Sequence, residues 1–135
     1  MESEYIVFVY GTLKPGGHYW PIFCEGKTVG SAVSAKIRGS LYDLHVGYPG
    51  MVLDDSGWVC GFLLTFRREA DFLDLDRLEG FVPGRHASRN EYNRLKVPCF
   101  SPDGGALGEF WGYEMSMVSV NRHKGTRMES GNWQV

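Results

Sequence analysis

Glycine residues divide this chain into short segments, and this division limits the folds that it can adopt. The sequence has 18 glycines among 135 residues, and the runs between them are apolar or alternate between apolar and polar side chains. Short runs with these patterns predict β-strands rather than long helices. We therefore expect strands at residues 5–10, 36–44, 50–53, 58–66, 91–100 and 106–115.

A single segment has the period of an amphipathic helix. Its apolar side chains recur at every third position, namely Phe72, Leu75 and Leu78. Acidic and basic residues fill the other face, so we expect a helix over residues 68–79 that ends at Gly80 in a left-handed cap. The pattern assigns three acidic side chains to its solvated face: Asp71, Asp74 and Asp76. A shorter helix is expected within residues 18–25, and residues 119–135 are polar and predicted to be irregular.

Many short strands with one long helix predict a single α+β or barrel-like domain over residues 1–135. Turn sequences at residues 47–50 (GYPG) and 101–105 (SPDGG) separate neighbouring strands. The strict alternation of strand and helix that builds a dinucleotide-binding fold is missing.

The composition argues against several classes of partner. The net charge is −2 and the pI about 6.1, so we expect no nucleic-acid binding. No apolar stretch approaches the roughly 20 residues of a membrane span, and the acidic start "MESEYIVFVY" is unlike a secretory signal. Cys24, Cys60 and Cys99 form no metal or redox motif, which favours reduced thiols in a cytoplasmic protein. No exposed apolar stripe is evident in the pattern, so we expect a monomer.

The turn at residues 11–17, "GTLKPGG", directly follows the first predicted strand. It lacks the Gly-Lys-Ser/Thr ending of a phosphate-binding P-loop and the spacing of a dinucleotide-binding loop. Two interpretations remain, a plain turn with its corner at Pro15 or a nest of main-chain amides that binds a carboxylate. The four histidines have no metal-ligand spacing, so the sequence predicts neither a metal nor another cofactor.

Glu79 is the acidic residue best placed for proton transfer. It follows Leu78 at the end of the predicted helix, near the buried face. The negative end of the helix dipole and partial burial both raise the pKa of a carboxyl there. A carboxyl with a raised pKa can act as a base or acid near neutral pH. The alternative interpretation is a solvated glutamate before a capping glycine.

Several of these segments, taken in order, resemble the gamma-glutamyl cyclotransferase-like family. The resemblance rests on VYGTLKPG at residues 9–16 and on LDRLEGF at residues 75–81. It is extended by LYDL with YPG within 41–50, GWVCGFLLTF at 57–66, YNRLKV at 92–97 and SGNW at 130–133. The combination of the first two motifs is specific, although either alone would be weak.

The resemblance implies a compact α+β domain on a small mixed β-barrel with one main α-helix. It implies that Glu79 is catalytic and that the main-chain amides of Gly11, Thr12 and Leu13 hold the glutamyl part of a small-molecule substrate. It also assigns Tyr10, Tyr92 and Arg94 to positions that line or support the pocket. The family's closing Gly-Asp-Trp is represented here with Asn132 in place of the aspartate, which removes a charge.

The implied reaction is a cyclotransfer on a γ-glutamyl amine or amino acid. The α-amino group attacks the γ-carbonyl within the same molecule, which forms 5-oxoproline and releases an amine. Because the attack is intramolecular, the protein has mainly to fold the glutamyl chain, to take a proton from the α-ammonium and to return it to the leaving amine. Two alternatives stay open: a non-catalytic domain of the same fold that binds a small carboxylate or a protein partner, and an enzyme that passes the γ-glutamyl group to water or another amine.

Overall fold

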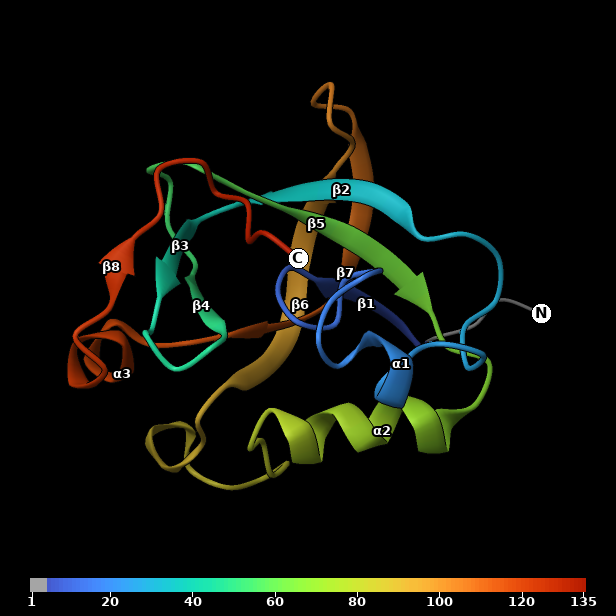
Figure 1. The fold of residues 1–135 in the computed structure, drawn as a ribbon, viewed down its shortest axis with the longest axis horizontal. Coiled ribbons are helices and arrows are strands. Elements are labelled where there is room, and N and C mark those ends of the chain that lie inside the picture. Colours follow the sequence, from blue (N-terminus) through green and yellow to red (C-terminus); the bar gives the residue numbers. More distant parts are fainter. Residues whose placement is uncertain (1–4) are drawn as a thin grey trace.

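A computed structural model describes residues 5–135, and its strands build a barrel with a small sheet beside it (Figure 1). The strands are β1 (Ile6–Val9), β2 (Val33–Arg38), β3 (Ser40–Asp43), β4 (Pro49–Val52), β5 (Trp58–Thr65), β6 (Asn93–Phe100), β7 (Ala106–Glu114) and β8 (Thr126–Arg127). The helices are α1 (Trp20–Phe23), α2 (Glu69–Leu78) and α3 (Met117–Arg122), with a single 3-10 turn at Ala87–Arg89. The prediction about the chain's first residues falls partly on residues 1–4, which lie outside the described part.

The barrel closes in the order β1-β5-β2-β6-β7. Its neighbours are antiparallel except for β1 and β7, which run parallel and complete the closure. Closure leaves none of these strands as an open edge. The prediction of an α+β fold on a small mixed barrel with one main helix is therefore confirmed.

The predicted strand at 36–44 is wrong, because the chain forms two strands there that belong to different sheets. β2 begins earlier, at Val33, and pairs with β5 inside the barrel. At Gly39 the chain leaves the barrel, and a Cβ at this position would lie 2.7 Å from the carbonyl oxygen of Val52. β3 then joins β4 and β8 in a three-stranded sheet. Pro49 and Gly50 belong to β4, so the predicted turn at 47–50 is shorter than expected.

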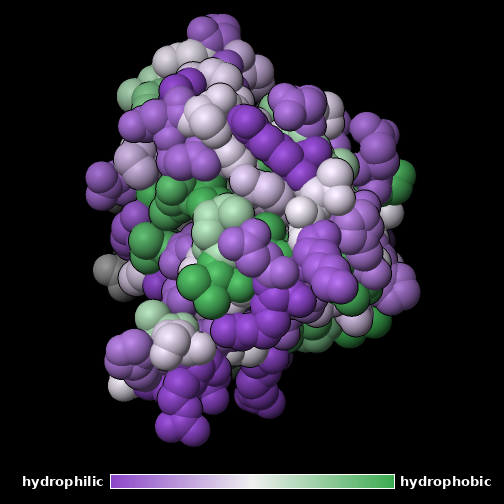
Figure 2. Space-filling view, turned by 90° about the vertical axis from the view of Figure 1, so that its left-hand side faces the viewer, coloured by the Kyte–Doolittle hydropathy of each residue, from purple (hydrophilic) through white to green (hydrophobic). Residues whose placement is uncertain are grey.

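Residues 117–122 form helix α3 rather than the irregular structure predicted for the polar end of the chain. The Ser116 side chain accepts a hydrogen bond from the Ser119 amide and caps the helix. Val120, which belongs to this helix, is buried. The helix and β8 lie beside β3 and β4, and this face is predominantly hydrophilic with small groups of apolar side chains between the polar ones (Figure 2).

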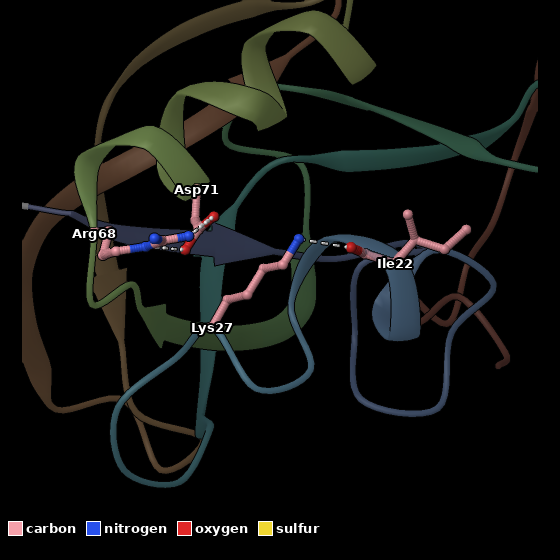
Figure 3. Close-up of polar contacts among 4 residues, drawn as sticks. All are labelled: Ile22, Lys27, Arg68 and Asp71. Atoms are coloured by element: carbon pink, nitrogen blue, oxygen red, sulfur yellow. Dashed lines mark hydrogen bonds and ion pairs between the residues drawn. The ribbon is translucent and has the colours of Figure 1, made fainter.

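Helix α2 runs along one end of the barrel, and its buried face is wider than the sequence pattern predicts. Phe72 and Leu75 are buried as expected, and Gly80 ends the helix with a φ of 66°. The assignment of Asp71 and Asp76 to the solvated face is wrong, since each residue is only 6% exposed. The Arg68 guanidinium donates to the Asp71 carboxylate at the start of the helix (Figure 3).

Helix α1 is shorter than the predicted 18–25, and it packs beside α2. The loop that follows is held by Lys27, whose Nζ donates to the carbonyl of Ile22 at 2.9 Å (Figure 3). Within residues 5–135 no helix is both long and apolar enough to cross a membrane. The three cysteines are free, two of them buried and Cys60 half-buried. The expected cytoplasmic location and monomeric state stay predictions.

Candidate active site

A cavity of about 260 Å³ lies where four segments of the chain meet. These four segments are the turn after β1, the connection from β3 into β4, the end of α2 and the start of β6, and side chains of β1 and β7 complete the wall. The cavity brings together six of the seven residues that the family resemblance assigned to a site: Tyr10, Gly11, Thr12, Leu13, Glu79 and Tyr92. The first and last residues of this set, Tyr10 and Tyr92, are 82 positions apart in the sequence, so the tertiary fold brings the set together.

The turn after β1 is fixed by two glycines that no larger residue could replace without movement. A Cβ on Gly11 would lie 2.9 Å from the Pro49 ring, and one on Gly17 would lie 2.4 Å from the Thr12 carbonyl oxygen. The Thr12 carbonyl accepts the amide of Tyr19 at 2.9 Å, which folds the turn back toward α1. The cavity wall here is therefore bare main chain.

The amides of Gly11, Thr12 and Leu13 are unpaired in the described part of the chain, and their residues line the cavity. Among residues 5–135, none of these three N–H groups donates a hydrogen bond to an acceptor of the protein. Unpaired main-chain amides in a turn form a nest that favours an anion. A carboxylate or a developing oxyanion is the chemical group that suits this wall.

Glu79 is the C-capping residue that directly follows α2. Its amide donates to the Leu75 carbonyl at 2.9 Å, and its carbonyl accepts the Tyr92 amide at 3.2 Å. Burial, followed by the nearby charge of Glu91, raises the pKa of the Glu79 carboxyl from 4.5 to about 8. This is the direction expected from the sequence. A carboxyl with such a pKa exchanges a proton near neutral pH.

Three buried tyrosines form much of the remaining wall. The Tyr10 hydroxyl donates to the Tyr113 carbonyl at 2.8 Å, and the Tyr92 hydroxyl donates to the Pro49 carbonyl. The Tyr113 hydroxyl donates to Oδ1 of Asp76 at 2.6 Å. Burial raises the pKa of all three hydroxyls, so they stay neutral. The wall is rigid because each hydroxyl is already committed to a protein acceptor.

Arg94, the seventh predicted site residue, lies outside the cavity. Its Nη1 is 3.5 Å from Oδ2 of Asp76, and its guanidinium lies over the ring of Trp111 at 4.7 Å. Asp76 in turn holds the Tyr113 hydroxyl. Arg94 therefore supports the wall through Asp76 and Tyr113 and does not form part of the wall itself.

Four of the lining residues that were not predicted from the sequence have polar side chains, namely Tyr19, Tyr48, Glu91 and Tyr113. Tyr48 belongs to the GYPG sequence and Glu91 directly precedes Tyr92, so both are neighbours of residues in the sequence motifs. The Tyr48 hydroxyl donates to Oε1 of Glu91 at 2.8 Å. No sequence signal connects these two residues, which are 43 positions apart.

The closing segment of the chain packs against the turn. Lys14 is 4% exposed, and its Nζ donates to Oδ1 of Asn132 at 2.9 Å and to the carbonyl of Trp133. Burial lowers the pKa of this ammonium. The Asn132 side chain thus acts as an acceptor that ties the end of the chain to the turn, even without the charge of an aspartate.

Comparisons with known proteins agree with the architecture and the motifs. The family model described as gamma-glutamyl cyclotransferase, AIG2-like, matches residues 7–135. A curated relative, the Gamma-L-glutamyl-butirosin B gamma-glutamyl cyclotransferase of Niallia circulans, is 32% identical over 107 residues, which cover 79% of this chain. The match spans 64% of that relative's length.

Solved structures share the fold at low sequence identity. An AIG2-like protein from Mus musculus superposes with a TM-score of 0.62 at 20% identity, covering 82% of this chain and 76% of that one. YkqA from Bacillus subtilis gives a TM-score of 0.65 at 22% identity, covering 98% of this chain and 40% of that one. Because the family model spans nearly the whole sequence, this chain belongs to the AIG2-like gamma-glutamyl cyclotransferase family.

Proposed function

We propose that this chain is a cyclotransferase that converts a γ-glutamyl amine or γ-glutamyl amino acid into 5-oxoproline and a free amine. The observation that carries the proposal is the position of Glu79, a carboxyl with a pKa of about 8 on the same cavity as the unpaired amides of residues 11–13. The Glu79 carboxylate can accept a proton, and the amides can donate hydrogen bonds to a negatively charged oxygen. Ring closure needs both functions.

The attacking nitrogen loses two protons on becoming the lactam nitrogen, and one carboxyl can pass both of them in turn to the leaving nitrogen. The Glu79 carboxylate takes a proton from the substrate's α-ammonium, and the freed amine attacks the γ-carbonyl carbon. A new C–N bond closes the five-membered ring while negative charge moves to the carbonyl oxygen. The protonated Glu79 gives this proton to the leaving nitrogen, and its carboxylate then takes the second proton from the new ring nitrogen. The original C–N bond breaks, the carbonyl re-forms, and the departing amine takes the second proton from Glu79 and leaves as an ammonium.

The pKa of Glu79 suits both proton transfers. At pH 7 a carboxyl with a pKa of about 8 is ionised in roughly a tenth of the free molecules. An α-ammonium bound beside it favours the ionised form, since an opposite charge lowers the pKa of a carboxyl. Once the ammonium has lost its proton, the surroundings again favour the protonated acid, which is the form that the leaving nitrogen needs.

The unpaired amides and the tyrosine wall supply the other requirements. The amides of residues 11–13 offer donors to the α-carboxylate or to the oxyanion that develops on the γ-carbonyl. Tyr10, Tyr92 and Tyr113 present rigid aromatic faces that hold the glutamyl chain in a folded conformation. The relative from Niallia circulans is named for a γ-glutamyl substrate, and we extend that substrate class, but not its amine, to this chain.

The proposal is tested by comparing wild-type protein with Glu79→Gln and Glu109→Gln. Glutamine keeps the shape of the side chain but cannot carry the proton, so turnover should fall by roughly 10²–10⁴-fold. Glu109 is exposed on β7 outside the cavity, so its variant matches the change in charge and should keep wild-type turnover. The assay detects 5-oxoproline by mass from a panel of γ-glutamyl compounds. Equal turnover by wild type and Glu79→Gln would refute the proposal, and free glutamate as the product would indicate transfer to water.

A further inference from the structure

The cavity has a one-sided distribution of charge. Its charged lining residues are Glu79 and Glu91, and none of the residues that line it is lysine, arginine or histidine. The cations nearest to Glu91 in the sequence are Arg89 and Arg94, and neither lines the cavity. Arg94 lies 3.5 Å from Asp76, and Arg85 in the 81–90 loop donates to the Gly80 carbonyl and to Oδ1 of Asn90. A substrate in this cavity therefore meets two carboxylates and no cationic side chain of the wall.

The two carboxylates occupy different depths. Glu79 is partly buried, whereas Glu91 is exposed at the rim. The backbones of the two segments are joined, since the Glu91 amide donates to the Gly80 carbonyl at 3.2 Å. A Cβ on Gly80 would lie 3.2 Å from the Cβ of Glu91 and 3.9 Å from its Oε2. The Glu91 carboxylate is thus placed just outside Glu79, between the cavity and solvent.

Tyr48 fixes the Glu91 carboxylate in this position. Its hydroxyl donates to Oε1 of Glu91 at 2.8 Å, and its ring lies 6.4 Å from the ring of Tyr92. Burial and the Glu91 charge raise the pKa of Tyr48 to about 12, so the hydroxyl remains a donor. One carboxylate oxygen of Glu91 is held by this bond, and the other has no hydrogen-bond partner within residues 5–135. A charged acceptor is therefore presented at the rim by a rigid aromatic support.

We infer that Glu91, held by Tyr48, selects leaving amines that carry an additional positive charge and discriminates against leaving groups that carry a carboxylate. The inference rests on the proposed function, in which the glutamyl end fills the inner cavity between the amide turn and Glu79. The leaving group then extends toward the rim, where Glu91, Tyr48 and Tyr19 stand. A cationic leaving group meets an opposite charge there. The carboxylate of a γ-glutamyl amino acid meets a like charge with no wall cation to offset it.

The test uses three substrates that share a four-carbon leaving group and differ only in its end. These are the γ-glutamyl amides of 1,4-diaminobutane, of butylamine and of 4-aminobutyrate, with a cationic, a neutral and an anionic end respectively. We expect kcat/KM to fall in that order, by about tenfold per step, the scale of one charge contact near a protein surface. In Glu91→Gln the three values should converge to within about threefold, while Glu109→Gln should keep the wild-type order.

The ratio of kcat/KM between substrates separates selection by Glu91 from a merely structural role of this residue. Glu91→Gln also removes a charge that raises the pKa of Glu79, but that effect acts on all three substrates alike at one pH. Tyr48→Phe keeps the carboxylate and loses its anchor, so it should reduce the preference only in part. Circular dichroism establishes that each variant is folded, and Glu91→Asp, which keeps the charge, should restore the order if glutamine perturbs the loop.

The outcomes distinguish the two proposals. Turnover of all three substrates at equal kcat/KM, or a preference that survives in Glu91→Gln, would overturn the selection by Glu91 and leave the cyclotransferase proposal standing. Absence of product from all three would contradict the cyclotransferase proposal. In that case the selection by Glu91 is tested by the rise in Tm on ligand binding. The 1,4-diaminobutane amide should stabilise the wild type more than the 4-aminobutyrate amide does. Equal rises in Tm would overturn the selection by Glu91.

Discussion

Replacing Glu79 by glutamine should make the folded protein more stable above pH 5, because the wild-type carboxyl is held where its charged form is disfavoured. The pKa of this carboxyl is raised from 4.5 to about 8 in the folded protein, mainly by burial and then by the Glu91 charge. Between these two pH values the folded protein keeps a proton that the unfolded chain releases. Stability therefore falls as the pH rises from 4.5 to 8, and glutamine, which does not titrate, is free of this loss.

The size of the effect follows from the two pKa values. The full difference corresponds to roughly 5 kcal/mol, and the part accumulated by pH 7 to roughly 3 kcal/mol. Part of the Glu79 side chain is reached by water through the cavity, which screens its charge. We therefore expect a gain of about 1–2 kcal/mol at pH 7, equivalent to a rise in Tm of about 4–8 °C for a domain of this size.

Thermal unfolding of wild type, Glu79→Gln and Glu109→Gln at pH 4.5, 5.5, 6.5, 7.5 and 8.5 measures the effect. The Tm difference between Glu79→Gln and wild type should grow across this range and level off above about pH 8. The exposed control Glu109→Gln should show no such trend. A difference that is constant over the whole range would refute the raised pKa, and with it the electrostatic basis of the mechanism.

Two further predictions concern the supports of the site. Gly11→Ala places a Cβ 2.9 Å from the Pro49 ring, so the amide turn must shift. We expect kcat/KM to fall at least tenfold with a small change in Tm. Unchanged kinetics would show that the position of the turn is unimportant. Tyr113→Phe removes the 2.6 Å hydrogen bond to buried Asp76 and leaves that carboxylate with Arg94 at 3.5 Å. We expect the free energy of unfolding, measured in urea, to fall by about 1–3 kcal/mol. A stability equal to wild type would contradict the role assigned to this bond.

The parts of the fold that were predicted correctly depend on local patterns. The alternation in β5 and the threefold spacing in α2 are properties of neighbouring residues, and both elements lie within about a residue of their expected bounds. The break at Gly39 was not predictable in this way. It results from the approach of the Val52 carbonyl, which the sequence places 13 positions away and the fold brings alongside.

The residues of the candidate site likewise divide into those that belong to local sequence motifs and those that only the tertiary fold brings to the site. Glu79 and the turn at Gly11 belong to sequence motifs, so both can be predicted as site residues from the sequence. Asp76 was assigned to solvent because its helical position is polar, yet it is buried by Tyr113 and Arg94, partners 37 and 18 positions away. Glu91 was missed for the same physical reason, since its position beside Gly80 is a property of the folded chain.

The pH dependence of kcat/KM for 5-oxoproline formation tests most directly the claim that Glu79 is the base of the ring closure. Because the ionised form must accept the proton, the rate should fall tenfold per pH unit below a pKa near 8. Glu91→Gln should move this limb to lower pH, since it removes a charge that raises the pKa of Glu79, and a limb that belonged to the substrate would stay in place. A rate independent of pH between 5.5 and 8, or a limb that does not move in Glu91→Gln, would contradict the account.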